Sequence, residues 1–528
     1  CQALENIKEK KPGTFHEAMQ LFWLFALLAG VINYGRLDDY LGPYLVADLK
    51  SGRLTDEEAY RYIHSLWTMI ENRRTTVNGR IIVGGKGRKH PKEADVFLHI
   101  AMKVAKNCRY VEPQFTLRFD KDTSEEIWDE ALDALGAGAT YPTLYNDDVN
   151  VPAVMYGMRV DEKAAEQYVP FGCTEFVIQG QSTGTPNICI NLLKLLTIYM
   201  NDGIDPIDGK RKSGPVPLKK LEEYQTFEEF YDGYKALLDY YLDLSVKAQY
   251  HSYEVMNQHV SFLFTSLLTD DCIARGKALL DGGVRYLGGT NETYGNINTS
   301  DSLWVIRDLV FNQKKYTLRQ LNDAMLANFN GYEALRKDCL NCDKYGNDLE
   351  TADTMANDLY EFVAKGVRNR GIAIGMQYFL IVISNNQLNT EWGNRTAASP
   401  DGRLSCMYMN PANNPQGGAN KSGPTAMLNS LAKFDAKYHG GSVQNIKFSP
   451  SMFNENRAVI KSLFKTYFAK GGCHLMVTVV DKGVLEDAVE HPENYPDLIV
   501  RVSGFSAVFV DLSPNIQQEL LSRVLYDK

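Results

Sequence analysis

The chain has 528 residues, of which 44% are hydrophobic and 23% charged, proportions that are ordinary for a folded globular protein and exclude collagen-like, disordered and coiled-coil chains. Its net charge of -9 is spread without long runs of like charge, which argues against nucleic acid or an anionic membrane surface as a partner. A chain of this length needs either one large core or several domains.

The cysteines and the apolar segments indicate where the protein works. The nine cysteines are odd in number and irregularly spaced, which favours a reducing cytoplasm over a disulfide framework. The longest apolar run, residues 21–32, is too short for a membrane span, which needs about twenty residues, so we expect a buried core helix there. No signal peptide is recognisable, and we expect a cytoplasmic protein.

Several helices and strands can be predicted in chain order. Helix starts are indicated by four Thr-x-x-Glu pairs, at Thr14/Glu17, Thr55/Glu58, Thr123/Glu126 and Thr226/Glu229. Apolar spacing predicts a buried helix over residues 185–196 (TPNICINLLKLL) and a long amphipathic helix after residue 226. Runs rich in β-branched and aromatic residues predict strands near Phe115, Val477 and Val508. Alternating helices and strands indicate an α/β chain.

One segment stands out as a domain boundary. Residues 410–423 (NPANNPQGGANKSG) consist almost entirely of turn-forming residues. We therefore predict two domains, residues 1–405 and 406–528.

Three motifs have simpler structural explanations. The Gly-rich segment at Gly84 lacks the Lys-Ser/Thr ending of a phosphate loop, and we interpret it as a tight turn. Cys339 and Cys342 form a single C-x-x-C, whereas zinc normally needs four ligands. The pair Asp147 and Asp148 is interpreted as turn or helix-cap chemistry. No metal site is predicted.

Two further segments are ambiguous by themselves. In residues 170–176 (PFGCTEF), Gly172 allows a sharp turn, and Cys173 and Glu175 can point to the same side of an extended backbone. A lone cysteine is more often a small buried hydrophobic residue than a nucleophile. Gly504 lies within a β-rich run, where glycine usually marks a bulge or the close approach of another group.

Together these two segments resemble the two signatures of the glycyl radical enzymes, G-C-x-E at residues 172–175 and R-V-x-G-[FY]-x-A at residues 501–507. The resemblance extends in order over nearly the whole chain. It includes TFHEAMQLFW at Thr14, YPTLYNDDVNVPA at Tyr141, GGTNETYGNINTSDSLWVI at Gly288, KYGND at Lys344, ASPDGR at Ala398, GPTAMLNSLAK at Gly423 and NIKFSP at Asn445.

The resemblance implies a role for each signature residue. Gly504 stores a radical, Cys173 becomes the thiyl that attacks the substrate, and Glu175 is the neighbouring acid/base. A glycyl radical is shared between the amide nitrogen and the carbonyl, which requires a planar α-carbon without a side chain. A thiol hydrogen is weak enough to exchange with that radical. Because hydrogen transfer needs contact, Gly504 and Cys173 must meet in a dry interior.

The resemblance also implies a fold and partners. The expected fold is a ten-stranded α/β barrel of two antiparallel five-stranded half-barrels surrounded by helices, with the cysteine and glycine loops meeting inside. Residues 1–405 then form a pyruvate formate-lyase-like domain without its N-terminal part, and residues 406–528 a glycyl radical domain. An activating enzyme with an iron-sulfur cluster and S-adenosylmethionine installs the radical, no cofactor is bound in turnover, and a homodimer is expected.

The neighbours of the cysteine indicate the branch of the family. Formate-lyase members use two adjacent cysteines, whereas Gly172 and Thr174 flank Cys173 here, which disfavours acetyl transfer. A carboxylate two residues after the cysteine resembles members that eliminate water, trimethylamine or sulfite from small 1,2-functionalised molecules. Asn187 and Phe176 are the candidate substrate-binding residues.

Two alternatives remain open. One is a decarboxylase or other carbon-carbon lyase, including a formate acetyltransferase-like enzyme, because some arylacetate decarboxylases share the G-C-x-E signature. The other is an inactive homologue that serves as a subunit or scaffold.

Overall fold

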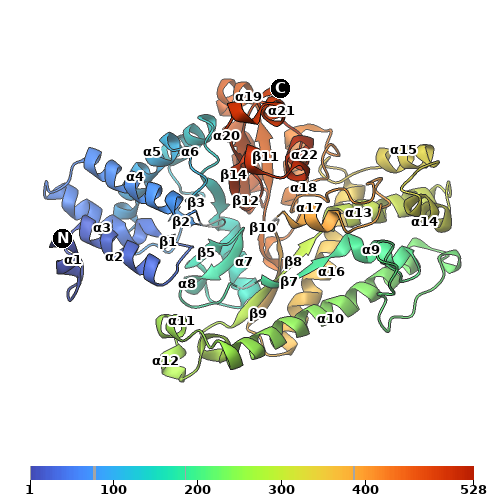
Figure 1. Cartoon of the computed structure of the whole chain (residues 1–528), viewed down its shortest axis with the longest axis horizontal. Coiled ribbons are helices and arrows are strands. Elements are labelled where there is room, and N and C mark those ends of the chain that lie inside the picture. Colours follow the sequence, from blue (N-terminus) through green and yellow to red (C-terminus); the bar gives the residue numbers. More distant parts are fainter. Residues whose placement is uncertain (1, 75–78, 185, 385–386, 528) are drawn as a thin grey trace.

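The computed structural model describes residues 2–74, 79–184, 186–384 and 387–527 as a mixed α/β structure (Figure 1). The side chains of Pro186 and Asn187 lie outside this description. Strands occupy the middle of the molecule, with the N-terminal helices at the left of the view and a long helix, α10, along its lower edge.

The α-helices are α1 (Gln2–Ile7), α2 (Phe15–Leu28), α3 (Leu37–Lys50), α4 (Asp56–Asn72), α5 (Pro91–Asn107), α6 (Glu125–Gly136), α7 (Asp147–Met158), α8 (Glu162–Ala165), α9 (Leu192–Met200), α10 (Phe227–His259), α11 (Leu263–Leu268), α12 (Cys272–Arg275), α13 (Asn296–Val305), α14 (Leu318–Leu326), α15 (Glu333–Asn341), α16 (Glu350–Ala373), α17 (Leu388–Gly393), α18 (Gly423–Ala432), α19 (Pro450–Glu455), α20 (Arg457–Ala469), α21 (Lys482–Glu490) and α22 (Pro514–Ser522).

The strands are β1 (Gly35–Arg36), β2 (Arg80–Gly84), β3 (Gln114–Phe119), β4 (Thr143–Asn146), β5 (Tyr168–Phe171), β6 (Glu175–Ile178), β7 (Pro186–Asn191), β8 (Gly288–Tyr294), β9 (Tyr378–Ile383), β10 (His439–Ser442), β11 (Asn445–Phe448), β12 (His474–Val479), β13 (Ile499–Arg501) and β14 (Ser506–Val508).

Ten of these strands form two sheets, one six-stranded in the order β1-β2-β3-β4-β12-β11 and one four-stranded in the order β10-β9-β8-β7. All neighbours are parallel except β4 and β12, which are antiparallel. The α/β prediction is confirmed. The described strands divide as six and four instead of two sets of five, because the antiparallel junction attaches β12 and β11 to the N-terminal sheet. The other strands form two antiparallel hairpins, β5–β6 and β13–β14.

Most predicted helix starts are confirmed. The hydroxyls of Thr14, Thr55 and Thr226 cap α2, α4 and α10 by accepting the backbone N–H three residues on. The prediction at Thr123 is wrong by one residue, because the Ser124 hydroxyl makes this contact and caps α6. The strands expected near Phe115 and Val477 are β3 and β12.

The apolar run at residues 21–32 is not the buried core helix that we expected. Phe15 and Met19 of α2 are buried, but Leu24, Phe25 and Leu28 of the same helix are 37 to 83% exposed. Only one face of α2 therefore contacts the core. In the described part of the chain, no helix is both long enough and apolar enough to cross a membrane.

The predicted helix over residues 185–196 is wrong in its first half. Pro186–Asn191 is strand β7, which pairs in parallel with β8, and α9 begins only at Leu192. The β-branched Ile188 and Ile190 suit a strand. The Asn191 side chain then accepts the backbone N–H of Lys194 at 2.9 Å and so caps the helix.

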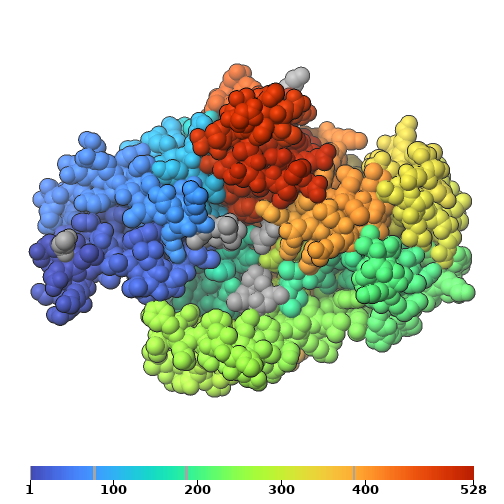
Figure 2. Space-filling model, in the orientation of Figure 1, coloured from blue at the N-terminus to red at the C-terminus, as the bar shows by residue number. Residues whose placement is uncertain are grey.

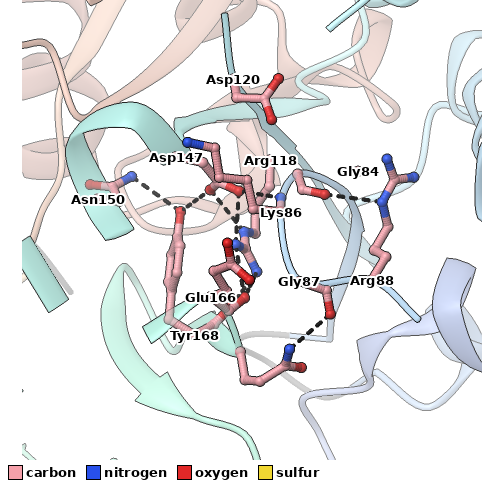
Figure 3. Close-up of polar contacts among 12 residues, drawn as sticks. Gly84, Lys86, Gly87, Arg88, Arg118, Asp120, Asp147, Asn150, Glu166 and Tyr168 are labelled. Carbon is pink, nitrogen blue, oxygen red and sulfur yellow. Dashed lines mark hydrogen bonds and ion pairs between the residues drawn. The ribbon is translucent and has the colours of Figure 1, made fainter. Parts of the chain in front are cut away.

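A buried charge cluster holds the start of the β5–β6 hairpin (Figure 3). Arg118 of β3 and Asp147 of α7 form an ion pair at 2.8 Å, with both side chains fully buried. The Tyr168 hydroxyl donates to Asp147 at 2.7 Å, and Arg118 donates to the Tyr168 carbonyl at 2.7 Å. The backbone N–H of Lys86 also donates to Asp147, at 2.7 Å. The Gly-rich segment 84–87 is thus a turn, as predicted, and Asp147 has a structural role.

The C-terminal part contains the second hairpin. Residues 410–422 form neither helix nor strand, and Gly504 lies in the turn between β13 and β14 and not within a strand. This hairpin packs in its own hydrophobic cluster, which includes Leu485, Val500, Phe505, Phe509 and Leu520. Figure 2 shows the C-terminal residues (red) as a lobe between the N-terminal part (blue) and residues near 400 (orange). The domain division at residues 405 and 406 stays a prediction.

Candidate active site

The turns of the two hairpins meet inside the protein. Cys173 lies in the turn between β5 and β6, and its side chain is 1% exposed. Gly504, in the other turn, is also buried. A methyl group placed on Gly504 would lie 2.5 Å from the α-carbon and 2.6 Å from the Sγ of Cys173. The structure therefore brings the two signature residues into contact, and only glycine fits at position 504.

Local backbone geometry places the carboxylate beside the cysteine. Gly172 has a φ of 55°, which favours glycine, and Phe171 pairs with Glu175 across the hairpin. The backbone N–H of Thr174 donates to Oε2 of Glu175 at 2.9 Å. A Cβ atom on Gly172 would lie 2.6 Å from that same oxygen. Glu175 thus folds back over the turn that carries Cys173.

Two buried arginines hold the two turns. Arg80 of β2 donates to both carbonyls that flank the start of the cysteine turn, those of Gly172 and Cys173, at 2.9 and 3.0 Å. Arg501 donates to the Ser503 carbonyl in the glycine turn at 2.7 Å. Both guanidinium groups also donate to Oε1 of Gln114, at 3.2 and 3.3 Å. Gln114 of β3 is therefore a shared contact between the two turns.

The surroundings of Cys173 keep its thiol protonated. The side chain packs in a small apolar cluster with Ala412, Val443 and Met476. Burial raises the pKa of the Cys173 thiol well above its ordinary value, and the charges of Glu175 and Glu292 raise it further. Nucleophilic cysteines need the opposite shift. A neutral S–H group is suited to giving up a hydrogen atom.

Glu175 can exchange a proton near neutral pH. Its side chain is 2% exposed. Burial, followed by the charge of Glu292, raises the pKa of Glu175 to about 7. A carboxyl group in this range can act as an acid or a base at physiological pH.

Sequence reasoning missed Glu292, Arg80 and Gln114. Glu292 lies on β8, whose residues are all buried, and its carboxylate accepts a hydrogen bond from the Tyr294 hydroxyl. Residues 288–306, which include Glu292, point to function only through the family resemblance. Arg80 is the single polar residue of β2, and the polar residues of β3 and β8 carry no motif, so spacing could not have singled out any of the three.

The structure describes the side chain of only one of the two candidate substrate-binding residues. Phe176 packs in a hydrophobic cluster on the opposite face of β6 from Glu175, with its ring centroid 5.3 Å from that of Tyr168. Asn187 lies in β7, but its side chain falls outside the described residues. The binding role of both residues stays a prediction.

One side-chain group in the described part of the chain has the spacing of metal ligands. The ligand atoms of His99, Glu126 and Glu130 lie within 4.8 Å of one another. These residues belong to α5 and α6 and do not include any residue of the two hairpins.

Comparison with known proteins agrees with this geometry. Trans-4-hydroxy-L-proline dehydratase of Clostridioides difficile is 28% identical over 99% of this chain and 69% of its own length. The glycyl radical subunit of 4-hydroxyphenylacetate decarboxylase from the same species is 26% identical over 100% of this chain and 65% of its own length. The structure of the B12-independent glycerol dehydratase from Clostridium butyricum superposes with a TM-score of 0.90, at 28% identity, over 100% of this chain and 69% of that one.

The chain thus spans about two thirds of the length of these relatives. Its fold is that of the glycerol dehydratase, which confirms the pyruvate formate-lyase-like fold implied by the resemblance, with the described strands in sheets of six and four. Residues 1–388 match the family described as pyruvate formate lyase-like, and residues 409–510 match the glycine radical domain. The chain therefore belongs to the pyruvate formate lyase-like glycyl radical enzymes.

Proposed function

We propose that this protein is a glycyl radical lyase of the dehydratase type, in which Gly504 stores the radical, Cys173 transfers it and Glu175 moves a proton. The observation that carries the proposal is the contact between Gly504 and Cys173, with Sγ 2.6 Å from a methyl group built on the glycine. The dehydratases among its relatives support the reaction type.

The reaction begins with two hydrogen-atom transfers. The Gly504 radical takes the hydrogen atom of the Cys173 thiol, which leaves a thiyl radical. The thiyl then takes a hydrogen atom from a substrate carbon that carries a hydroxyl group. The neutral state of the buried thiol supports this step, because a thiolate has no hydrogen atom to give.

The elimination follows on the substrate radical. Ionised Glu175 takes the proton of the hydroxyl group, and the leaving group on the adjacent carbon departs as water after accepting that proton. The remaining carbonyl radical recovers a hydrogen atom from Cys173. The sum converts a 1,2-diol into a carbonyl compound and water. The pKa of Glu175, raised to about 7 by burial and by Glu292, supports both halves of the proton transfer.

The partners are part of the same proposal. An activating enzyme that uses an iron-sulfur cluster and S-adenosylmethionine installs the radical on Gly504, after which turnover needs no bound cofactor. The protein works in the cytoplasm as a homodimer. Residues 1–405 carry the cysteine hairpin and residues 406–528 the glycine hairpin, and Asn187 contributes to the substrate pocket.

A second candidate function is decarboxylation of a larger acid. The decarboxylase subunit, 26% identical over 100% of this chain, favours it. Product analysis with diols, amino alcohols and arylacetates separates the two reactions. A radical that forms without turnover of any class would indicate an inactive homologue.

Electron paramagnetic resonance tests the proposal directly. After anaerobic activation we expect a doublet from the radical on Gly504, and exposure to air should cleave the chain at that residue. Gly504→Ala should give neither, because its methyl group would occupy the contact with Cys173. Gly13→Ala, whose methyl would lie at an ordinary 3.5 Å from Glu17, is the matched control. An activated chain without a doublet would refute the assignment.

A further inference from the structure

The helices α5 and α6, which pack against each other, bring three metal-ligating side chains together (Figure 1). His99 lies on α5, and Glu126 and Glu130 lie four residues apart on α6, a spacing that puts both carboxylates on one face of a helix. The Nδ1 of His99 lies 2.8 Å from Oε2 of Glu130. One ligand atom from each of the three residues lies within 4.8 Å of the other two. Three donors from two helices therefore converge on one point.

The acidic residues of α6 fall into two groups with different neighbours. Three of them form ion pairs with basic residues of α20, namely Glu125, Asp129 and Asp133. The carboxylates of Glu126 and Glu130 lie beside the imidazole of His99 instead. Within the ranges that the structure describes, no Lys or Arg forms an ion pair with either of these two. Their oxygens are therefore available to a metal ion.

The composition of the group determines which ion it suits. Zn²⁺ binds imidazole nitrogen and carboxylate oxygen at about 2.0–2.2 Å, so the ligand atoms of one ion lie about 3–4 Å apart. The side chains of His99 and Glu130 are 30 and 23% exposed, and Glu126 is exposed, so small side-chain rotations can bring the three atoms to these distances. One imidazole with two carboxylates suits Zn²⁺, Mn²⁺ or Co²⁺, whereas Mg²⁺ and Ca²⁺ prefer oxygen ligands alone.

We propose that His99, Glu126 and Glu130 bind a divalent transition-metal ion such as Zn²⁺, with water in the remaining coordination position. The ion replaces the hydrogen bond between His99 and Glu130, and the proton of that bond passes to solvent. Because its ligands come from both helices, the ion links α5 to α6. None of the three residues belongs to the cysteine or glycine hairpin, so this site is separate from the proposed radical chemistry.

The link would support the segment that contacts the glycine hairpin. The helix α6 ends at Gly136, four residues before Thr140. The Thr140 hydroxyl lies 2.9 Å from that of Ser506, and the guanidinium of Arg501 lies 5.4 Å from the ring centre of Tyr141. An ion between α5 and α6 therefore holds in place the helix that leads to these contacts.

Titration of the full chain with Co²⁺, under anaerobic conditions and without activation, tests the site independently of the proposed function. We expect one ion to bind through nitrogen and oxygen. Its visible absorption bands should appear without the near-ultraviolet sulfur-to-cobalt band that cysteine ligands produce. Zn²⁺ should displace the Co²⁺, whereas about a hundredfold excess of Mg²⁺ should not.

Substitution of each ligand tests which residues hold the ion. His99→Gln, Glu126→Gln and Glu130→Gln should each weaken Co²⁺ binding at least about tenfold, because loss of a group that only orients a ligand already costs about 10- to 100-fold. His251→Gln is the matched control. The His251 ring lies 3.2 Å from Glu254, but this pair has no third ligand among the described residues, so the variant should keep wild-type affinity.

The inference is overturned if Co²⁺ does not bind, if it binds the ligand variants as tightly as the wild type, or if a sulfur-to-cobalt band shows that cysteines hold it. Displacement by Mg²⁺ would equally contradict the proposed ligand set. Circular dichroism checks that each variant keeps its helices. Glu126 is exposed, so Glu126→Gln should fold normally and decides the question even where another variant misfolds.

Discussion

The cysteine hairpin and the glycine hairpin are anchored in different ways. The cysteine hairpin begins in the buried pair of Arg118 and Asp147, which ties it to the main sheet (Figure 3). The glycine hairpin packs in a smaller hydrophobic cluster of its own and reaches the rest of the protein through polar contacts. One of these is the contact of Arg501 with Gln114, and another joins the hydroxyls of Thr140 and Ser506 at 2.9 Å.

The proposed chemistry has two requirements, a fixed Cys173 thiol and a Gly504 turn placed against it, and each hairpin meets one of them. The cysteine hairpin is tied to the main sheet by a buried ion pair, whereas the glycine hairpin meets that sheet through a few hydrogen bonds. Substitutions in the cysteine hairpin and in the residues that anchor the two hairpins should therefore fail in distinguishable ways, and four of them test the comparison.

Cys173→Ser should have the largest effect, because it should leave the radical stored on Gly504 but prevent its transfer to the substrate. An O–H bond is too strong to exchange with a glycyl radical, so turnover should fall by at least about 10⁶-fold, the lower end of what enzymes supply. The doublet of Gly504 should remain, because the glycine hairpin is unchanged. Electron paramagnetic resonance and product assays on one activated sample measure both quantities. Cys406→Ser, at an exposed cysteine, is the control. Loss of the doublet in Cys173→Ser would show that storage of the radical on Gly504 also depends on the cysteine hairpin.

Glu175→Gln should lower turnover by about 10² to 10⁴-fold, the usual contribution of a general acid or base. Because the pKa of Glu175 is raised to about 7, its ionised fraction grows as pH rises through 7. If Glu175 takes the hydroxyl proton first, the rate should rise over the same range, and this rise should vanish in the variant. The exposed Glu229→Gln should keep the wild-type profile. A rate that falls through pH 7 would assign the first proton transfer to the acid form instead.

Asp147→Asn should destabilise the protein by about 3–5 kcal/mol, because it leaves the buried Arg118 without its counter-ion. Glu519→Gln provides the comparison within the glycine hairpin cluster. It breaks a pair with Arg523 at 2.7 Å in which the arginine side chain is 12% exposed, and we expect a smaller loss of about 1–3 kcal/mol. Urea unfolding measures both. Equal losses would mean that the two hairpins are anchored equally strongly.

Gln114→Leu should have the smallest effect. It removes the acceptor shared by Arg80 and Arg501, so the turns should shift slightly and kcat should fall about 10- to 100-fold. KM should not change, because the Gln114 side chain accepts from Arg80 and Arg501, which hold the two turns. Gln114→Glu keeps the acceptor and should restore kcat. A change in KM alone, or a variant in which Gln114→Glu fails to restore kcat, would contradict a role in aligning the turns.

Part of this arrangement could be predicted from the sequence. The signature residues Gly504, Cys173 and Glu175 were identified by resemblance, and the capping residues of three helices by local chemistry. The contact between the two turns depends on chain segments far apart in sequence, so it could be expected only through the family.

The supporting residues could not be predicted, for physical reasons. Arg80 lies in a buried, otherwise apolar strand, and its hydrogen-bond partners come from β3 and the cysteine turn, far away in sequence. A short apolar run fits a buried strand as well as a buried helix, so the pattern alone could not place residues 186–191 in strand β7. Thr123 and Ser124 are both good caps, but the Thr123 hydroxyl bonds to Asp120, and the Ser124 hydroxyl caps α6.

The Gly-rich turn at residues 84–87 has a practical consequence for anyone who wishes to redesign this enzyme. A β-carbon on Gly85 would lie 2.7 Å from that of Arg118, and one on Gly87 would lie 2.8 Å from that of Glu166. Mutant libraries should therefore keep these glycines. A larger side chain at either position would displace Arg118 or Glu166, which hold the start of the hairpin that carries Cys173.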